Sequence, residues 1–168
     1  MPQIPQPDIV LIQQQLATMP SKRSRILKGI ELLLKTVDKD NGYIVGLRNV
    51  SFNVKGWQDL PEDQTPVAYI VDSNTMIVRH AGCVREYTWD IEVFGCVKGK
   101  DIWDFENLIA DVEQAIYDNN TLFGECNKME VENILTDNQL FSQTQQNGAQ
   151  LFSMVVKMEF TRKARNAR

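Results

Sequence analysis

Histidine and cysteine serve in many nucleophilic catalytic sites and in most zinc sites, and this chain of 168 residues contains few of either. It has one histidine, His80, and three widely spaced cysteines, Cys83, Cys96 and Cys126. Catalytic triads and most zinc sites need a histidine beside a nucleophile or a second ligand. We therefore expect His80 to be a solvated or packing side chain. Without a CxxC pair, the cysteines indicate reduced thiols in a cytosol rather than a disulfide framework.

Motifs that bind phosphate or divalent metal ions are equally weak. The nine glycines nowhere form GxxxxGK[ST] or GxGxxG, the loops whose backbone N–H groups hold phosphate. The adjacent acids Glu62 and Asp63, or Glu130 with Glu132, could be imagined as Mg²⁺ ligands. Alternate acids on a strand, however, usually serve solubility. The sequence therefore predicts no enzyme, no cofactor and no bound metal.

The charge is unevenly distributed along the chain. All 22 acidic residues precede position 162, whereas four of the 18 basic residues lie in the last seven positions. The acidic body should repel nucleic acid on average. Residues 162–168 form a basic tail that either contacts phosphate or an acidic partner, or is a frayed solvated end. The tryptophans adjoin aspartates more than basic residues, which argues against stacking on bases.

Composition and hydropathy indicate a soluble protein. The apolar fraction is 43% and the charged fraction 24%, both ordinary for a globular domain. No stretch approaches the ~20 apolar residues that a membrane-spanning helix needs. The first 19 residues lack the basic region of a secretory signal. We therefore expect an intracellular protein that does not enter a membrane.

Residues 1–20 are expected to form an arm before the main domain. They contain four prolines and three consecutive glutamines, and proline at this density prevents a continuous helix or central strand. Within the arm, Asp8 could cap a short helix that carries Ile9, Ile12 and Leu16 on one face. The arm could therefore dock on the domain.

Residues 21–161 are expected to form a single α+β domain. Apolar side chains recur at spacings of three and four in its helices and alternate in its strands. The first expected elements are a helix from Ser21 to about Asp38, a strand at Val50–Val54 and an excursion from Trp57 to Gly82. A strand from Tyr87 to Val97 and a helix from Ile102 to Ile116 follow. Two further strands, from Met129 to Ile134 and from Phe152 to Phe160, complete the domain. The excursion contains short strand candidates at Val67–Val71 and Met76–Val78 and is either a hairpin or an extended loop. This order favours an antiparallel sheet of about four main strands with helices packed on one face.

The alternation patterns also assign side chains to the core or to solvent. In the first expected strand, Val50, Phe52 and Val54 should be buried. In the strand from Tyr87 to Val97, Trp89 lies in the buried register and should belong to the core. Trp57 fits neither periodic pattern and could anchor an interface. In the helix from Ile102 to Ile116, the acids are expected on the outside, namely Asp104, Glu106, Asp111 and Glu113.

The succession of elements from Arg25 to Thr161 resembles the tail terminator (tail completion) proteins of long-tailed bacteriophages. After the opening helix, the segment Pro66–Val71 reads PVAYIV. The strand segment Trp89–Val93 reads WDIEV, and a helix follows it at Ile102–Ile116. The stretch Thr136–Asn138, which reads TDN, leads into the last alternating strand. Each piece is a weak pattern, and their order over about 135 residues carries the resemblance.

The resemblance implies a structural protein of the virion without catalytic activity. Members of that family form a homo-hexameric ring that binds the last ring of the tail tube, stops tube polymerisation and presents the surface that joins the head. The expected partners are the tail tube protein and a head completion or connector protein. The expected location is the head-proximal end of the tail in the virion, and the host cytoplasm during assembly. Genomic DNA would pass through the ring without specific binding.

Two sets of residues are candidates for roles in such a ring. We expect subunit or partner contacts at Trp57, Leu60, Tyr69, Met76 and Val78. We expect acidic side chains that face the lumen at Glu86, Asp90 and Glu92, where repulsion of like charge would let DNA slide. Two other classes of function remain open at this point. One is another head-tail connector, neck or minor tail subunit, and the other is a small ligand-binding or enzymatic α+β domain.

Overall fold

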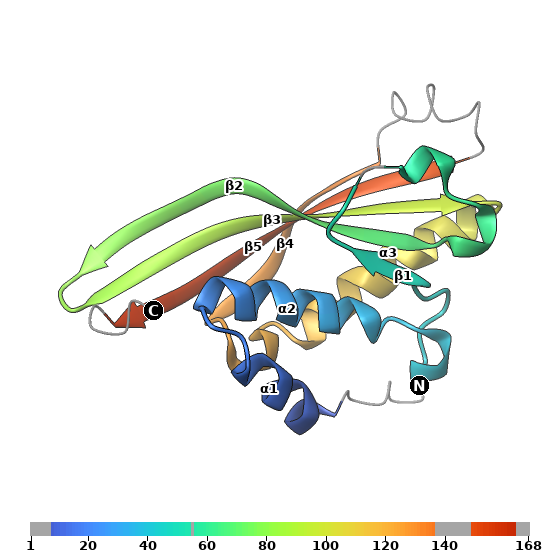
Figure 1. Ribbon diagram of the computed structural model, residues 1–168. Helices are drawn as coiled ribbons and strands as arrows, with labels where there is room; N and C mark the ends of the chain where they lie inside the picture. The colour runs from blue at the N-terminus through green and yellow to red at the C-terminus, as the bar shows by residue number, and fades with distance from the viewer. Residues whose placement is uncertain (1–7, 55, 137–148, 164–168) are drawn as a thin grey trace.

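The computed structural model describes residues 8–54, 56–136 and 149–163. Three helices lie beneath one face of a sheet (Figure 1), so the expected α+β class is confirmed. In chain order the helices and strands are α1 Ile9–Ala17, α2 Lys22–Lys35, β1 Asn49–Ser51, β2 Val67–Ala81, β3 Val84–Lys98, α3 Ile102–Asp118, β4 Lys128–Leu135 and β5 Ala149–Lys163. Four single 3₁₀ turns complete the set, η1 Lys39–Asn41, η2 Trp57–Asp59, η3 Glu62–Gln64 and η4 Leu122–Gly124.

The sheet has five strands in the order β1-β2-β3-β5-β4. Three of its pairings are antiparallel, as expected, but β1 runs parallel to β2. The expectation of a purely antiparallel sheet of about four strands was therefore incomplete. A parallel pair needs a crossover of a dozen or more residues, and residues 52–66 supply it. Because β1 ends at Ser51, Phe52 is not held in the sheet, and it is 49% exposed instead of buried.

The second half of the excursion is a long strand rather than a loop. Strand β2 pairs with β3 from Val67 to Ala81 and forms a hairpin that turns at Gly82, where φ is +61°. The register shifts between Asp72 and Met76, which is a bulge that leaves the strand continuous. The two short strand candidates are therefore parts of one strand. In Figure 1 the hairpin extends beyond the helices at the left of the view.

The main core lies between the sheet and the helices. Strand β3 contributes Trp89, Ile91 and Val93, which are all fully buried. Helix α3 contributes Phe105, Leu108 and Val112 from its inner face, and α2 and β5 supply further apolar side chains. The alternation in β3 and β5 therefore predicted their inward faces, with Phe152, Met154, Val156, Met158 and Phe160 buried on β5. The apolar stripe expected from Ile102 to Ile116 is buried except at Ile102, which is 50% exposed. Helix α2 begins where expected, because the hydroxyl of Ser21 accepts a hydrogen bond from the N–H of Ser24.

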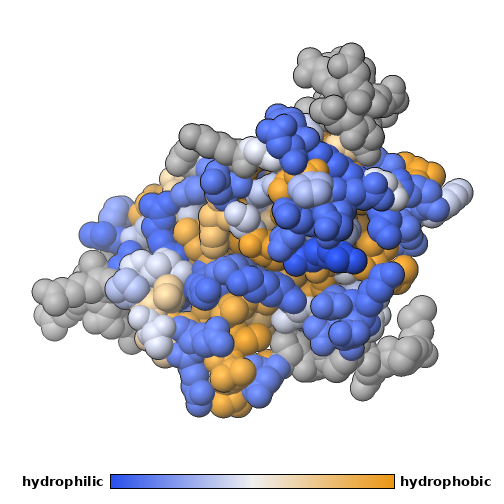
Figure 2. All heavy atoms as spheres, turned by 45° about the vertical axis from the view of Figure 1, so that its right-hand side comes forward, coloured by the Kyte–Doolittle hydropathy of each residue, from blue (hydrophilic) through white to orange (hydrophobic). Residues whose placement is uncertain are grey.

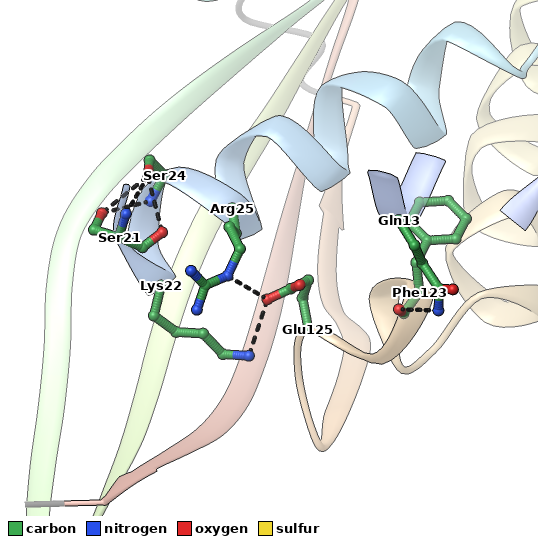
Figure 3. A network of polar contacts seen from close by, with 7 residues as sticks. All are labelled: Gln13, Ser21, Lys22, Ser24, Arg25, Phe123 and Glu125. Carbon is green, nitrogen blue, oxygen red and sulfur yellow. Dashed lines mark hydrogen bonds and ion pairs between the residues drawn. The ribbon is translucent and has the colours of Figure 1, made fainter. Parts of the chain in front are cut away.

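The short helix expected in the arm forms and docks. Asp8 accepts a hydrogen bond from the N–H of Leu11 at 3.2 Å and caps α1. Ile12 and Leu16 are buried, whereas Ile9 is 41% exposed. The Gln13 side chain donates to the backbone oxygen of Phe123 at 3.1 Å (Figure 3). Residues 8–20 therefore belong to the packed structure.

Helix α2 also bonds to Glu125, the residue that follows turn η4. The carboxylate of Glu125 accepts hydrogen bonds from Lys22 at 3.0 Å and from Arg25 at 3.1 Å (Figure 3). All three side chains are partly buried. Leu122 packs closely against Gly29, and a Cβ added at position 29 would lie 3.0 Å from the Leu122 side chain, which would have to shift by a few tenths of an ångström. This contact fixes the connection between α3 and β4.

Candidate assembly surfaces

Three of the five residues proposed for partner contacts pack inside the chain. Tyr69 is 3% exposed and lies in a second, smaller core on the face of the sheet opposite the helices. Trp57 and Leu60 are partly buried against this second core, and the Trp57 ring meets Phe94 edge-on with centroids 6.1 Å apart. The first half of the excursion therefore covers one end of the open face. Tyr69 has a structural role in the folded chain and offers almost no surface to a partner.

The other two candidates lie on the hairpin. Met76 is partly buried against the main core, in register with Trp89. Val78 is 43% exposed, and its neighbour Ile77 is 55% exposed. The five residues thus do not form one surface. Val78 alone among the five is exposed, and the assignment of these residues to partner contacts stays a prediction.

The three acids of β3 lie on one face of the sheet. Glu86, Asp90 and Glu92 project from the face opposite Trp89, and Glu86 is exposed while the other two are partly buried. Glu92 accepts a hydrogen bond from the Ser153 hydroxyl at 2.5 Å. Lys157 stands opposite Asp90 in the register. This face therefore has a charged region that is at least partly exposed to solvent, as expected of a sheet with one solvated side.

Basic residues interrupt this acidic row. The amine of Lys157 contacts Glu132 at 3.0 Å, and this hydrogen bond raises the pKa of Lys157. Arg79 stands opposite Glu86 across the hairpin. A groove of about 420 Å³ crosses this region, with acids and bases both in its walls. The face is a mixed surface in which acids outnumber bases, and its orientation toward a lumen stays a prediction.

A second hollow lies beside the excursion. It measures about 620 Å³ and is lined by both signs of charge, including Arg48, Glu62, Lys98 and Lys100. The amine of Lys98 donates to the backbone oxygens of Gln58 at 2.6 Å and Leu60 at 2.8 Å, so it holds the excursion in place. Its role there is structural.

Metal-binding and membrane-spanning features are absent from the described part of the chain. Among residues 8–54, 56–136 and 149–163, no group of three or more His, Cys, Asp or Glu side chains is placed to hold a metal ion. His80 is exposed near the end of the hairpin. None of the helices within these ranges is long and apolar enough to cross a bilayer.

Asp111 is a structural residue that the periodicity assigned to the outside of its helix. It is 5% exposed, and its carboxylate accepts hydrogen bonds from the backbone N–H groups of Ile44, Val45 and Gly46 at 3.1, 2.7 and 3.3 Å. The prediction of an exposed Asp111 is wrong, because the loop after α2 folds over this flank of α3 and replaces water as its partner. Helical periodicity carries no signal for such a contact.

Asp111→Ala should lower the free energy of unfolding by about 2 to 3 kcal/mol, because three backbone donors lose a charged acceptor. Urea denaturation followed by circular dichroism measures the change. Glu113→Ala is the matched control, since Glu113 lies on the same helix and is exposed. Equal stability of the two variants would contradict the role of Asp111.

The three thiols should differ sharply in reactivity. Burial raises the pKa of Cys96 and of Cys126 to about 11, whereas Cys83 is exposed at the hairpin turn. A thiol-disulfide reagent at neutral pH attacks the accessible thiolate. We therefore expect one fast-reacting thiol in the native protein and three after denaturation. Fast reaction of a second thiol in the native state would contradict the packing described for Cys96 or Cys126.

Three elements carry more than one exposed large hydrophobic side chain, and Figure 2 shows hydrophobic patches separated by broad hydrophilic areas. The three groups are Ile9, Val10 and Leu11 on α1, Ile77 and Val78 on the hairpin, and Ile102, Trp103 and Tyr117 on α3. Such patches on a folded chain mark candidate contacts with partners.

No protein-family model matches the chain, and no curated protein is significantly similar to it.

Proposed function

We propose that this chain is a structural protein of a bacteriophage virion, a tail terminator that caps the tail tube. In this proposal six copies form a ring at the head-proximal end of the tail. One side of the ring binds the last ring of tail tube protein, and the other meets a head completion or connector protein. The ring assembles in the host cytoplasm, and it carries out no catalysis.

The observation that supports the proposal best is the division of the sheet into two unlike faces. All three helices pack on one face, which Trp89 shares, while Glu86, Asp90 and Glu92 project from the other. A sheet with a helix layer outside can close into a ring whose inner surface is polar. Acidic side chains on that surface would repel DNA, so that the genome slides without sticking.

The order of helices and strands is a second support. The opening helix α2, the helix α3 after the strand that contains WDIEV, and the final strand β5 follow one another in the order that the resemblance implies. Order alone defines an architecture that many proteins share. The proposal therefore depends on assembly, which can be measured.

The purified protein should form a defined ring. Sedimentation velocity should give a mass about six times the 19.3 kDa of the chain, and negative-stain images should show closed rings with a central hole. A head-to-tail contact that closes produces such a species. A protein that stays monomeric both alone and with tube protein would contradict the proposal.

A further inference from the structure

The end of the β2–β3 hairpin is basic and partly apolar. We call residues 77–86, with Arg162 beside them on β5, the hairpin tip. Arg79 and Arg85 are exposed, and Arg162 stands opposite Arg85 in the register and lies 6.0 Å from the centre of the Tyr87 ring. Glu86 is the only acid within this set. Successive strand residues point to opposite sides of a sheet, so Ile77 and Arg79 lie on the face of Glu86, whereas Val78, Arg85 and Arg162 share the other face, that of Trp89. This second face of the tip presents positive charge beside the exposed Val78.

Helix α3 has the opposite character on its outer side. The segment 101–118 contains no lysine or arginine. Its fully outward positions recur at spacings of three and four, and they form what we call the α3 stripe. The stripe consists of Trp103, Glu106, Ala110, Glu113 and Tyr117, all exposed.

The aromatic residues of the α3 stripe are unusually exposed. Trp103 is 74% exposed and Tyr117 is 75% exposed, the highest values among the large hydrophobic side chains of the described residues. They flank the two glutamates of the stripe. An aromatic ring beside a carboxylate suits an arginine, because the guanidinium can stack on the ring and bond to the acid.

The two surfaces lie too far apart to meet within one chain. Strand β3 begins at the hairpin turn with Val84 and ends at Lys98, and α3 starts at Ile102. A strand of 15 residues spans roughly 50 Å. Figure 1 shows the hairpin extending away from the helices, at the far end from the start of α3. Each surface is therefore left for another molecule.

We propose that the hairpin tip of one copy docks on the α3 stripe of a second copy. Arg85 and Arg162 meet Glu106 and Glu113 in this contact, and Val78 supplies the apolar part. The inference rests on the proposed ring and names the surfaces that join its subunits. Because the two surfaces differ and lie at opposite ends of the molecule, the contact is head-to-tail, and its repetition closes a ring.

Charge reversal on each surface tests the contact. The variants are Arg85→Glu with Arg162→Glu, Glu106→Arg with Glu113→Arg, and all four together. Each double variant should sediment as a monomer at a concentration where the wild-type protein is a ring. The fourfold variant, with the charges exchanged, should recover at least part of the ring. Circular dichroism should remain native, since exposed substitutions usually change stability by less than about 0.5 kcal/mol.

Two further variants separate this contact from general effects of charge. Lys39→Glu with Arg48→Glu makes the same change in net charge at exposed positions outside both surfaces, and it should leave the ring intact. Trp103→Ala removes an aromatic anchor without changing charge, and it should raise the concentration needed for half-assembly at least about tenfold.

The outcomes distinguish failure of this inference from failure of the proposed function. Rings that persist in both double variants overturn the inference and leave the terminator ring in place. Loss of binding to double-stranded DNA without loss of the ring in Arg85→Glu with Arg162→Glu would show that the tip serves nucleic acid, and it also overturns the inference. A wild-type protein that is monomeric and does not cap tubes overturns the proposed function as well.

Discussion

Trp89→Ala should lower the free energy of unfolding by about 3 to 5 kcal/mol, or prevent folding altogether. Trp89 is fully buried at the centre of the sheet, and its indole N–H donates to Asp72 at 3.0 Å. The Arg23 guanidinium lies 4.7 Å from the centre of the ring and bonds to Asp72 at 2.7 Å. The substitution therefore leaves a cavity and disconnects the β2 bulge from α2.

Urea denaturation and circular dichroism would measure this loss, with Trp103→Ala as the matched control. Both variants remove the same indole, but Trp103 is 74% exposed and makes little contact in the single chain. The control should change the stability of the monomer by less than about 0.5 kcal/mol. The free energy of unfolding of Trp89→Phe should lie between those of Trp89→Ala and Trp103→Ala. A Trp89→Ala variant that loses less than 1 kcal/mol would contradict the placement of Trp89 in the core.

Local periodicity predicted most of the regular structure. The alternation in β3 and β5 identified which side chains face the helices, because successive strand residues point to opposite sides. Spacings of three and four located α2 and α3 together with most of their buried faces. The cap at Asp8 and the docking of Ile12 and Leu16 also followed from a few neighbouring residues. In each of these cases the sequence pattern and the feature that it predicts lie within a single helix or strand.

Contacts between distant segments were less predictable. The parallel pairing of β1 depends on the path of residues 52–66, which no short pattern records. Tyr69 is buried because Trp57 and Leu60 fold over the same face of the sheet. Asp111 is buried because a loop more than 60 residues earlier in the chain bonds to it. These side chains were assigned from local exposure patterns alone, and tertiary packing overrode those patterns.

The candidate surfaces were predictable only in part. The acidic positions of β3 followed from alternation, but the basic partners Arg79 and Lys157 come from neighbouring strands whose register was unknown. In the α3 stripe, helical periodicity predicted that Glu106 and Glu113 face outward. The exposure of Trp103 and Tyr117 became known only from the packing of the helix in the structure. A surface made by several strands or helices needs their relative placement before it can be recognised.

Tail length in an infecting phage that lacks this chain tests the central claim most directly. A terminator ends a stacking series because its ring matches the tube end on one side and offers no tube-binding surface on the other. Without it, tube protein should continue to add to the growing end. Wild-type protein supplied from a plasmid is the control and should restore normal tails.

Negative-stain images of the lysate give the decisive measurement. We expect tails of widely varying length that are not joined to heads, beside filled heads of normal appearance. The length distribution should narrow again when the wild-type protein is supplied. Tails of normal length in the mutant lysate, or the complete absence of tails, would contradict the assignment as a tail terminator.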